Sequence, residues 1–374
     1  MTIRRECLRE GIFSLGTEKK LENIFDREHE KKYITTLIRS RAWFSICGLR
    51  RTGKTTLIRS IAHSLEGFST VYVNARELPE ENTFDAFLER LKEEIATILW
   101  RSKLRNLASR ISKLSFIGVS ISLRDRAQVK LVTALGNVVK RKPLIIIIDE
   151  APYILMYDRA HKFLSALHDR FAPEIVVALT GSVISLKHSL EKDETKPLYG
   201  RVEEELMLQQ FDEVLSRRYL LEGFQQCGVD PPGILIETGA RNLGGFAGWL
   251  TLYGRIIVRR IITGVEINAS DILRELEDRA RKVVYGEIAK FLRFKKNFRV
   301  YIRVLKKIAV EGESRLVEIS STINRDPSTT TFYLDQLVLH GIVRKINRRY
   351  IIPDPLVRRA IQRPEFEKEI KIRL

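Results

Sequence analysis

The chain has 374 residues, of which 44% are hydrophobic and 30% are charged, a balance typical of globular proteins with two or three domains. No apolar run approaches the roughly 18–20 residues that cross a bilayer, and charged residues break the N-terminal segment where a secretory leader needs a hydrophobic stretch. The three cysteines form no CxxC pair or Cys/His cluster, so the sequence predicts isolated thiols in a reduced, cytoplasmic compartment and no zinc site.

The formal net charge of +18 is concentrated in two regions of the sequence. Residues 101–142 hold eleven Lys or Arg and one acidic residue, and residues 293–374 hold nineteen Lys or Arg and nine acidic residues. Basic regions of this kind favour a polyanionic partner, most plausibly nucleic acid. The alternative explanation is a general richness in charged side chains, as in many thermophilic proteins.

Between residues 43 and 210, apolar strand-like runs alternate with helical patterns, after a first helix at about 28–39. The expected strands are 43–47, 70–74, 144–148, 175–180 and 202–208, and the expected helices are 54–65, 83–100, 127–140 and 159–170. Strands that alternate with helices predict an α/β fold with a parallel five-stranded sheet. The aliphatic run Leu144–Ile148 is what a sheet covered on both faces requires.

Two further regions are expected, one inserted within the core of residues 1–210 and one following it. Residues 101–126 read as a basic insertion, with a helical pattern over 104–114 and a strand-like alternation over 117–123. Residues 211–294 have a helical pattern broken by turn residues, which predicts a helical lid subdomain.

Residues 295–374 are expected to form a third domain. Amphipathic helices are predicted at 300–309 and 318–323, and a third helix begins at the cap Asp326 and ends before Gly341. Two short strands, 342–346 and 350–352, follow around a turn. Three helices and a two-stranded ribbon are the outline of a winged helix-turn-helix.

An eight-residue motif joins the first expected strand to the helix that follows it. Gly48-Leu49-Arg50-Arg51-Thr52-Gly53-Lys54-Thr55 matches G-x-x-x-x-G-K-[ST] at every position. Glycines let backbone amides turn toward phosphate oxygens, and the helix adds its positive N-terminal end. Lys54 supplies charge to the β- and γ-phosphates, and the Thr55 hydroxyl can ligate Mg²⁺. We therefore predict that Gly48 to Thr56 bind ATP with magnesium.

The acidic partner of this loop follows the strand Leu144–Ile148 as Asp149-Glu150. Asp149 can hold hydrated Mg²⁺ opposite Thr55, and Glu150 can polarise the attacking water as a general base. The alternative role for the pair is to cap the next helix. Because a general base separates hydrolysis from simple binding, Glu150 predicts an ATPase that releases ADP and phosphate.

At these motifs the chain resembles the archaeal ATPase family, in the AAA+/STAND branch of P-loop ATPases, over about residues 20–360. Phe25-Asp26-Arg27-Glu28 resembles the family's F-x-R-E element, which implies that Phe25 and Arg27 lie beside the nucleotide base. Thr180-Gly181-Ser182 stands where the family has its sensor, and Pro197-Leu198-Tyr199-Gly200-Arg201 matches its P-L-Y-G-R motif. Gly244-Gly245-Phe246-Ala247 stands at the lid motif G-G-x-P without the proline, and Asp354-Pro355-Leu356 follows the ribbon as in relatives.

The resemblance implies two further catalytic roles. Ser182, or its neighbour Thr180, would sense the γ-phosphate or orient water. Arg201 would stabilise transition-state charge as an arginine finger, supplied in cis or from a neighbouring subunit. The structural alternatives are a strand-end turn for Ser182 and an ion pair with Glu203–Glu205 for Arg201.

The C-terminal domain is the expected contact for duplex DNA. A winged helix places its third helix in the major groove while the ribbon contacts the backbone. Here the positive charge lies around that helix rather than on it, which suits phosphate contacts that position without specifying. The candidate DNA contacts are Arg325, Thr329, Thr330, Arg344, Lys345, Arg348 and Arg349.

Together these features predict a nucleotide-driven switch in which ATP closes the lid and repositions the winged helix. One alternative is a DNA-bound initiator with slow hydrolysis. Another is a STAND-type signalling or defence scaffold that forms a homo-oligomer on ATP without binding DNA.

Overall fold

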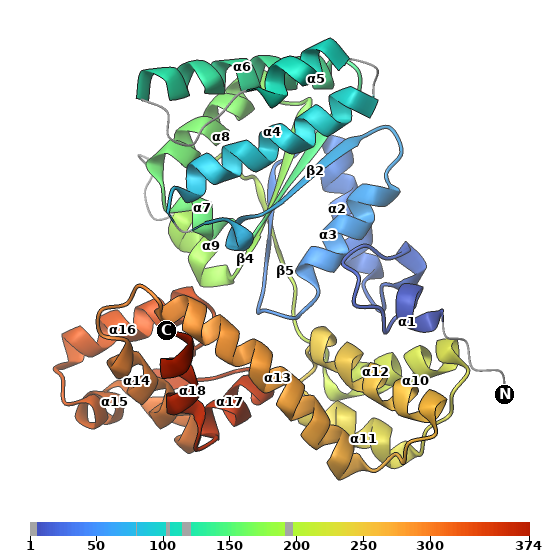
Figure 1. The fold of residues 1–374 in the computed structure, drawn as a ribbon, viewed down its shortest axis with the longest axis vertical. Coiled ribbons are helices and arrows are strands. Elements are labelled where there is room, and N and C mark those ends of the chain that lie inside the picture. The colour runs from blue at the N-terminus through green and yellow to red at the C-terminus, as the bar shows by residue number, and fades with distance from the viewer. Residues whose placement is uncertain (1–5, 80, 102–104, 114–120, 191–196) are drawn as a thin grey trace. The chain divides into compact units, whose positions relative to one another are not determined.

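The computed structural model describes residues 6–79, 81–101, 105–113, 121–190 and 197–374, and the chain divides into two compact units (Figure 1). The first unit comprises Met1–Gly16, Arg50–Thr52 and Gln209–Leu374. The second unit comprises Thr17–Leu49 and Gly53–Leu208. Arg50–Thr52, which belong to the phosphate-loop motif, are thus assigned to the first unit.

The second unit is built on a parallel five-stranded sheet, as the sequence predicted. The strands are β1 Phe44–Cys47, β2 Ser69–Asn74, β3 Leu144–Asp149, β4 Ile175–Gly181 and β5 Glu204–Met207, in the order β2-β3-β4-β1-β5. All four pairings are parallel, so the carboxyl ends of the strands meet at one edge of the sheet. That edge carries the predicted phosphate loop after β1 and the acidic pair at β3.

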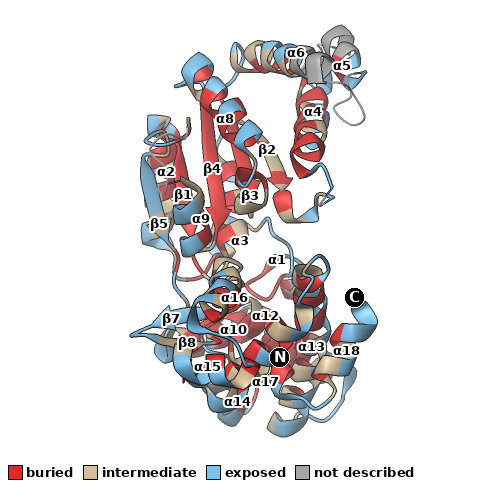
Figure 2. Cartoon of the chain, turned by 90° about the vertical axis from the view of Figure 1, so that its left-hand side faces the viewer, coloured by how far each residue is buried: buried red, intermediate tan, exposed pale blue. Residues whose placement is uncertain are grey.

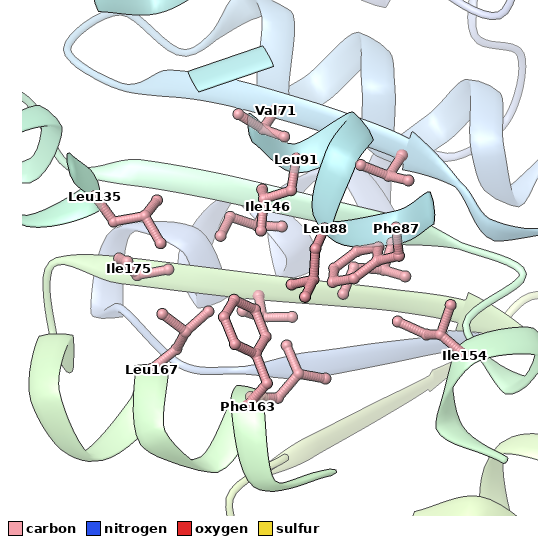
Figure 3. Close-up of a cluster of buried hydrophobic side chains, with 14 of the residues drawn as sticks. Val71, Phe87, Leu88, Leu91, Leu135, Ile146, Ile154, Phe163, Leu167 and Ile175 are labelled. Carbon is pink, nitrogen blue, oxygen red and sulfur yellow. The ribbon is translucent and has the colours of Figure 1, made fainter. Parts of the chain in front are cut away.

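Helices cover both faces of this sheet. They are η1 Leu21–Asn23, α2 Glu28–Ser40, α3 Lys54–Ser64, η2 Ala75–Glu77, α4 Thr83–Arg101, α5 Arg105–Ser112, α6 Ile121–Val139, α7 Pro152–Leu155, α8 Asp158–Phe171 and α9 Val183–Leu190. One face packs on α2 and α3 through side chains such as Ile38 and Ile58. The other packs on α4 and α8 through Leu88, Phe163 and Leu167 (Figure 3). β3 and β4 are consequently buried along their whole length, as Figure 2 shows.

The expected insertion is helical where the structure describes it. Arg105–Ser112 forms α5, in agreement with the helical spacing of this stretch. The strand expected over 117–123 falls partly on residues 114–120, which lie outside the described residues. At Ile121–Leu123 the prediction is wrong, because these residues open helix α6, which runs on to Val139. A short alternation of apolar and small residues does not by itself separate strand from helix.

The first unit is mostly helical. Its helices are α1 Cys7–Glu10, α10 Glu213–Cys227, α11 Gly233–Asn242, α12 Ala247–Thr263, α13 Ala269–Leu292, α14 Phe298–Glu311, α15 Leu316–Ile323, α16 Pro327–Leu339, α17 Pro355–Gln362 and α18 Phe366–Arg373. Three short strands, β6 Glu313–Arg315, β7 Arg344–Ile346 and β8 Arg349–Ile351, pair antiparallel in the order β6-β8-β7. The sequence predicted the last two but not β6, which has only three residues. The residues of the expected lid and C-terminal domain thus fall within one unit, and the proposed boundary near residue 294 stays a prediction.

The N-terminal segment belongs to this first unit. The Phe13 ring lies 5.1 Å from that of Phe224, and Arg255 Nη1 donates a hydrogen bond of 2.9 Å to the Phe13 carbonyl. Gly223 and Gly254 make room for the Phe13 ring, since a Cβ at either position would lie within 2.4 Å of it. These contacts of Phe13 join residues far apart in the sequence, so no local sequence pattern predicted them.

The cysteines differ from the sequence prediction. Cys7 and Cys227 form a disulfide across a sequence separation of 220 residues, so the prediction of isolated thiols is wrong for this pair. Cys47 is free and buried, and burial raises its pKa to about 12, which keeps the thiol protonated. Among the described helices, none combines the length and the apolar character needed to cross a membrane.

Candidate active site

The phosphate-loop motif links β1 to α3 at the carboxyl edge of the sheet. The Gly48 amide donates a hydrogen bond of 3.2 Å to the Gly181 carbonyl at the end of β4, which fixes the start of the loop. Gly53 caps α3 with a φ of +99°, a left-handed conformation that strains any residue with a side chain. Lys54 Nζ donates to the Gly48 and Leu49 carbonyls at 3.0 and 2.8 Å. The Lys54 ammonium group is therefore buried in the loop. Phosphate oxygens of a bound nucleotide could replace the two carbonyl oxygens as its hydrogen-bond acceptors.

Asp149 is the last residue of β3, and three hydroxyl groups donate to its carboxylate. Thr55 Oγ1 and Tyr72 Oη lie 2.8 and 2.9 Å from Oδ2, and Thr180 Oγ1 donates to Oδ1. The structure thus brings together Thr55 and Asp149, the two predicted magnesium residues. It also adds Tyr72, which sequence reasoning missed.

These oxygen atoms suit Mg²⁺, which prefers carboxylate and hydroxyl ligands and keeps several waters. In the described part of the chain, no group of three or more His, Cys, Asp or Glu side chains could hold a metal ion. A magnesium ion held by Thr55 and Asp149 would therefore complete its coordination with nucleotide phosphates and water, as is usual for nucleotide-binding enzymes.

Glu150 follows at a sharp turn after β3. Its φ of +52° is left-handed, and its amide donates to Thr180 Oγ1 at 3.1 Å. The next amide, of Ala151, donates to the Thr180 carbonyl at 2.8 Å. Within the residues that the structure describes, no hydrogen bond or ion pair engages the Glu150 carboxylate, so this group is available to a water molecule.

The two sensor candidates take different positions. Thr180 lies in the site, because its hydroxyl contacts both Asp149 and the Glu150 amide. Ser182 instead accepts a hydrogen bond of 3.2 Å from the Ser185 amide in the first turn of α9, the geometry of a turn residue. A γ-phosphate sensor role for Ser182 stays a prediction. Between them, Gly181 must be glycine, since a Cβ would lie 2.9 Å from Pro152 Cδ.

Arg201 forms a bidentate ion pair with Asp169 on α8. Its Nε and Nη2 atoms donate to Oδ1 and Oδ2 at 3.0 and 3.1 Å, and Nη1 donates to the Pro197 carbonyl. The expected structural alternative named Glu203–Glu205 as partners, whereas Asp169 holds this place. The arginine-finger role stays a prediction, and it requires Arg201 to leave Asp169.

Phe25 and Arg27 lie just before and at the start of α2. Phe25 is buried, and Arg27 Nη1 forms an ion pair of 2.8 Å with Glu30. Their predicted contact with the nucleotide base stays a prediction.

Arg51, in the middle of the loop motif, is held by side chains of the first unit. Its guanidinium lies 4.3 Å from the centre of the Trp249 ring and forms ion pairs with Glu287 at 2.7 Å and Asp354 at 3.2 Å. Arg50 also lies 3.7 Å from Glu287. The Gly248 amide donates to the Arg51 carbonyl at 3.0 Å, so the start of α12 contacts both the backbone and the side chain.

Asp354 is the centre of this cluster. It accepts hydrogen bonds from Trp249 Nε1 and from the Leu356 and Val357 amides at the start of α17. Burial raises the pKa of the Asp354 carboxyl group, and the positive charge of Arg51 opposes that rise. The sequence singled out Asp354 only through the D-P-L motif, and no spacing linked it to Arg51.

The candidate DNA contacts divide into exposed and buried residues. Arg325, Arg344, Lys345 and Arg348 are exposed, and Arg349 forms an ion pair of 2.6 Å with Glu313. Thr330 is fully buried and its hydroxyl donates to the Asp326 carbonyl, so the prediction of a surface contact there is wrong.

Thr329 lies at the start of α16. Its amide and its hydroxyl group donate hydrogen bonds of 2.8 and 2.6 Å to the carboxylate of Asp326, the residue that caps the helix. This residue therefore acts first as part of the helix cap, and a contact with DNA stays a prediction.

Comparison with known proteins places the chain in a family. A family model described as an ATPase domain predominantly from Archaea matches residues 24–247, a range that includes the phosphate loop, Asp149, Glu150 and Arg201. No protein with a curated description matches this chain in sequence.

Solved structures share the fold over nearly the whole chain. A Walker-type ATPase of Pyrococcus abyssi is 23% identical with a TM-score of 0.72, over 94% of this chain and 100% of that one. The ORC2 protein of Aeropyrum pernix, in ADPNP and ADP complexes, is 14% identical with a TM-score of 0.60, over 96% and 97%. The ORC1 protein of the same organism, in complex with DNA, is 15% identical with a TM-score of 0.53, over 97% and 98%. At these identities the likeness shows the fold alone.

Proposed function

Because the chain belongs to the family of ATPase domains found predominantly in Archaea, we propose that it is a nucleotide-driven switch that couples magnesium-dependent ATP hydrolysis to DNA binding. The family membership makes the chain an ATPase. The proposal adds what the hydrolysis is used for and which residues transmit it.

In this proposal each residue of the site has a separate role in ATP hydrolysis. The backbone amides of the loop and Lys54 bind the phosphates, and Thr55 with Asp149 would hold Mg²⁺, which supplies charge for the leaving phosphates. Glu150 takes a proton from the attacking water, while Thr180 keeps both acidic residues in place. Arg201 stabilises transition-state charge once it is released from Asp169.

The observation that carries the switch is the position of Arg51. It is one of the eight residues of the phosphate loop, yet Trp249, Glu287 and Asp354 of the first unit hold its side chain. A ligand shifts a conformational equilibrium only through contacts that differ between the two states. Phosphates that reshape residues 48–55 would change the geometry of these Arg51 contacts, which are the differential contacts that the switch requires.

DNA binding is supported by the C-terminal elements. The element order α14, β6, α15, α16, β7, β8 supports the proposal of a winged helix, in which α16 would be the third helix. Asn347 and Arg348 both have positive φ and form a two-residue turn between β7 and β8, where Arg344, Lys345 and Arg348 are exposed. Exposed cations on a ribbon suit phosphate contacts, whose strength falls with salt.

The test measures duplex-DNA affinity by fluorescence anisotropy at two salt concentrations, without nucleotide, with ADP and with a non-hydrolysable ATP analogue. Allosteric coupling of ordinary size predicts a change of about fivefold or more between nucleotide states. The variant Arg51→Ala keeps the loop glycines and Lys54, so we expect it to retain ATP binding and to lose most of this nucleotide effect. Arg281→Ala is the matched control, because Arg281 also bridges two carboxylates of the first unit, Glu365 and Asp278.

Other outcomes separate the proposals. DNA affinity that is independent of nucleotide in the wild-type protein overturns the switch. If duplex DNA does not bind at either salt concentration and the analogue produces oligomers in size-exclusion chromatography, the STAND-type scaffold replaces it. Loss of ATP binding in Arg51→Ala would make Arg51 a nucleotide ligand rather than a transmitting residue.

A further inference from the structure

Tyr72 lies on β2, two residues before the end of that strand. The parallel pairing sets Tyr72 beside Ile147 and Asn74 beside Asp149. Alternate residues of a strand share one face, so Tyr72 lies on the face of the sheet that Asp149 also uses. A step of two residues spans roughly 6.6 Å, which is about the reach of a phenol side chain. The register therefore delivers the Tyr72 hydroxyl to Asp149 Oδ2, at 2.9 Å.

The Tyr72 ring is fixed from the side of α3, the helix that begins with Lys54. The Arg59 guanidinium lies over the ring, 4.0 Å from its centre, and Arg59 forms an ion pair with Glu18. In this hydrogen bond the phenol is the donor and the Asp149 carboxyl oxygen the acceptor. Both the ring and the hydroxyl of Tyr72 are thus held by named partners.

Asp149 Oδ2 accepts hydrogen bonds from the hydroxyl groups of Thr55 and Tyr72. These two donors are expected to behave differently when magnesium binds. The Thr55 hydroxyl would ligate Mg²⁺, and it would then leave Oδ2. Tyr72 has no such second role, so its hydroxyl group can hold the carboxylate while the metal binds.

We propose that Tyr72 is a positioning residue that holds the Asp149 carboxylate in the orientation needed to bind magnesium with nucleotide. This inference rests on the proposed magnesium-dependent function. In this role Tyr72 acts through Asp149, to which its hydroxyl donates a hydrogen bond.

The variant Tyr72→Phe removes the hydroxyl and keeps the ring beneath Arg59. We expect the Mg²⁺ concentration that gives half-maximal binding of a fluorescent ATP analogue to rise about tenfold or more, the scale of one hydrogen bond to a charged acceptor. Affinity for the same analogue in EDTA should stay within about twofold, because Lys54 and the loop amides are unchanged. A purely structural role would weaken binding equally under both conditions, and that result overturns the proposal.

Tyr33→Phe is the matched control. Tyr33 Oη also donates to a carboxylate, Glu204, at 2.7 Å, but on α2 and away from the acidic pair. Its removal should leave the magnesium titration unchanged. A shift of equal size in both variants would show a general effect of losing a phenol and would overturn the role of Tyr72.

The wild-type titration tests the magnesium role itself. If the wild-type protein binds the analogue equally with Mg²⁺ and with EDTA, the proposed magnesium-dependent function is contradicted. The role of Tyr72, which rests on it, is then contradicted as well. If the wild-type protein depends on Mg²⁺ and Tyr72→Phe does not differ from it, only the role of Tyr72 is overturned.

A second measurement tests the proposal if the variant Tyr72→Phe does not fold. The wild-type protein with 3-fluorotyrosine at position 72 should show a ¹⁹F resonance that moves when Mg²⁺ is added to the nucleotide complex, whereas a label at position 33 should not respond. An unmoved resonance at position 72 overturns the proposal.

Discussion

The carboxyl edge of the parallel sheet and the basic ribbon of the first unit use charge in opposite ways. At the sheet edge, Lys54 and Asp149 are buried and each has several hydrogen-bond partners. On the ribbon, Arg344, Lys345 and Arg348 are exposed. The difference teaches that a site for chemistry needs its charges fixed in advance, whereas a surface for a polyanion needs only charge that is accessible. Single substitutions should therefore be severe at the first and graded at the second.

Glu150→Gln should produce the largest effect. The amide cannot accept the proton of the attacking water, so we expect the turnover number to fall about 10²- to 10⁴-fold while ATP affinity stays within a few fold. Steady-state phosphate release and equilibrium binding measure the two quantities. Glu174→Gln is the control, because Glu174 is exposed and precedes β4 at the opposite edge of the sheet. Wild-type turnover in Glu150→Gln would remove Glu150 as the base.

Lys54→Ala comes next. Loss of the ammonium group removes a charge-assisted contact to the phosphates, so ATP affinity measured by calorimetry should fall about 50-fold. Lys32→Ala, which removes an exposed lysine of α2, should bind ATP normally. Unchanged affinity in Lys54→Ala would contradict the site and with it the contrast between the two regions.

Joint replacement of Arg344 and Arg348 by Ala should have the mildest effect. Each phosphate contact contributes about 0.9 to the slope of log affinity against log salt, so the slope should fall by about 2. Anisotropy titrations of duplex DNA at several salt concentrations measure this slope. Replacing the exposed Lys32 and Arg39 together removes the same charge from α2 and should leave the slope unchanged. Equal slopes for the two double variants would mean that net charge, not the ribbon, attracts DNA.

The sequence predicted which residues lie at the carboxyl edge of the sheet because the motif fixes both residue type and spacing. Gly53 and Lys54 stand where the motif requires them, and Asp149 ends β3 one residue beyond the predicted strand. Tyr72 was missed although its strand was predicted, because its partner depends on which strands are neighbours. Once β2 is known to pair with β3, the register identifies it.

The parts that failed depend on distant contacts. Nothing near Cys7 or Cys227 indicates their pairing, and nothing near Arg51 indicates Asp354, 303 residues away. Thr330 looked accessible on a polar helix start, but α16 turns that side chain inward, where it is fully buried. Local patterns predict elements well, whereas partners across the chain require the packing itself.

The first unit takes residues from both ends of the described chain, and this has a consequence for synthesis on the ribosome. The sheet of the second unit is contained in residues 17–208, so all its strands have been made before α10 begins. Phe13 and Cys7 have to wait for α10, since their partners Phe224 and Cys227 are made more than 200 residues later. All strands of the sheet are thus made before the first unit has the residues that hold Phe13 and Cys7.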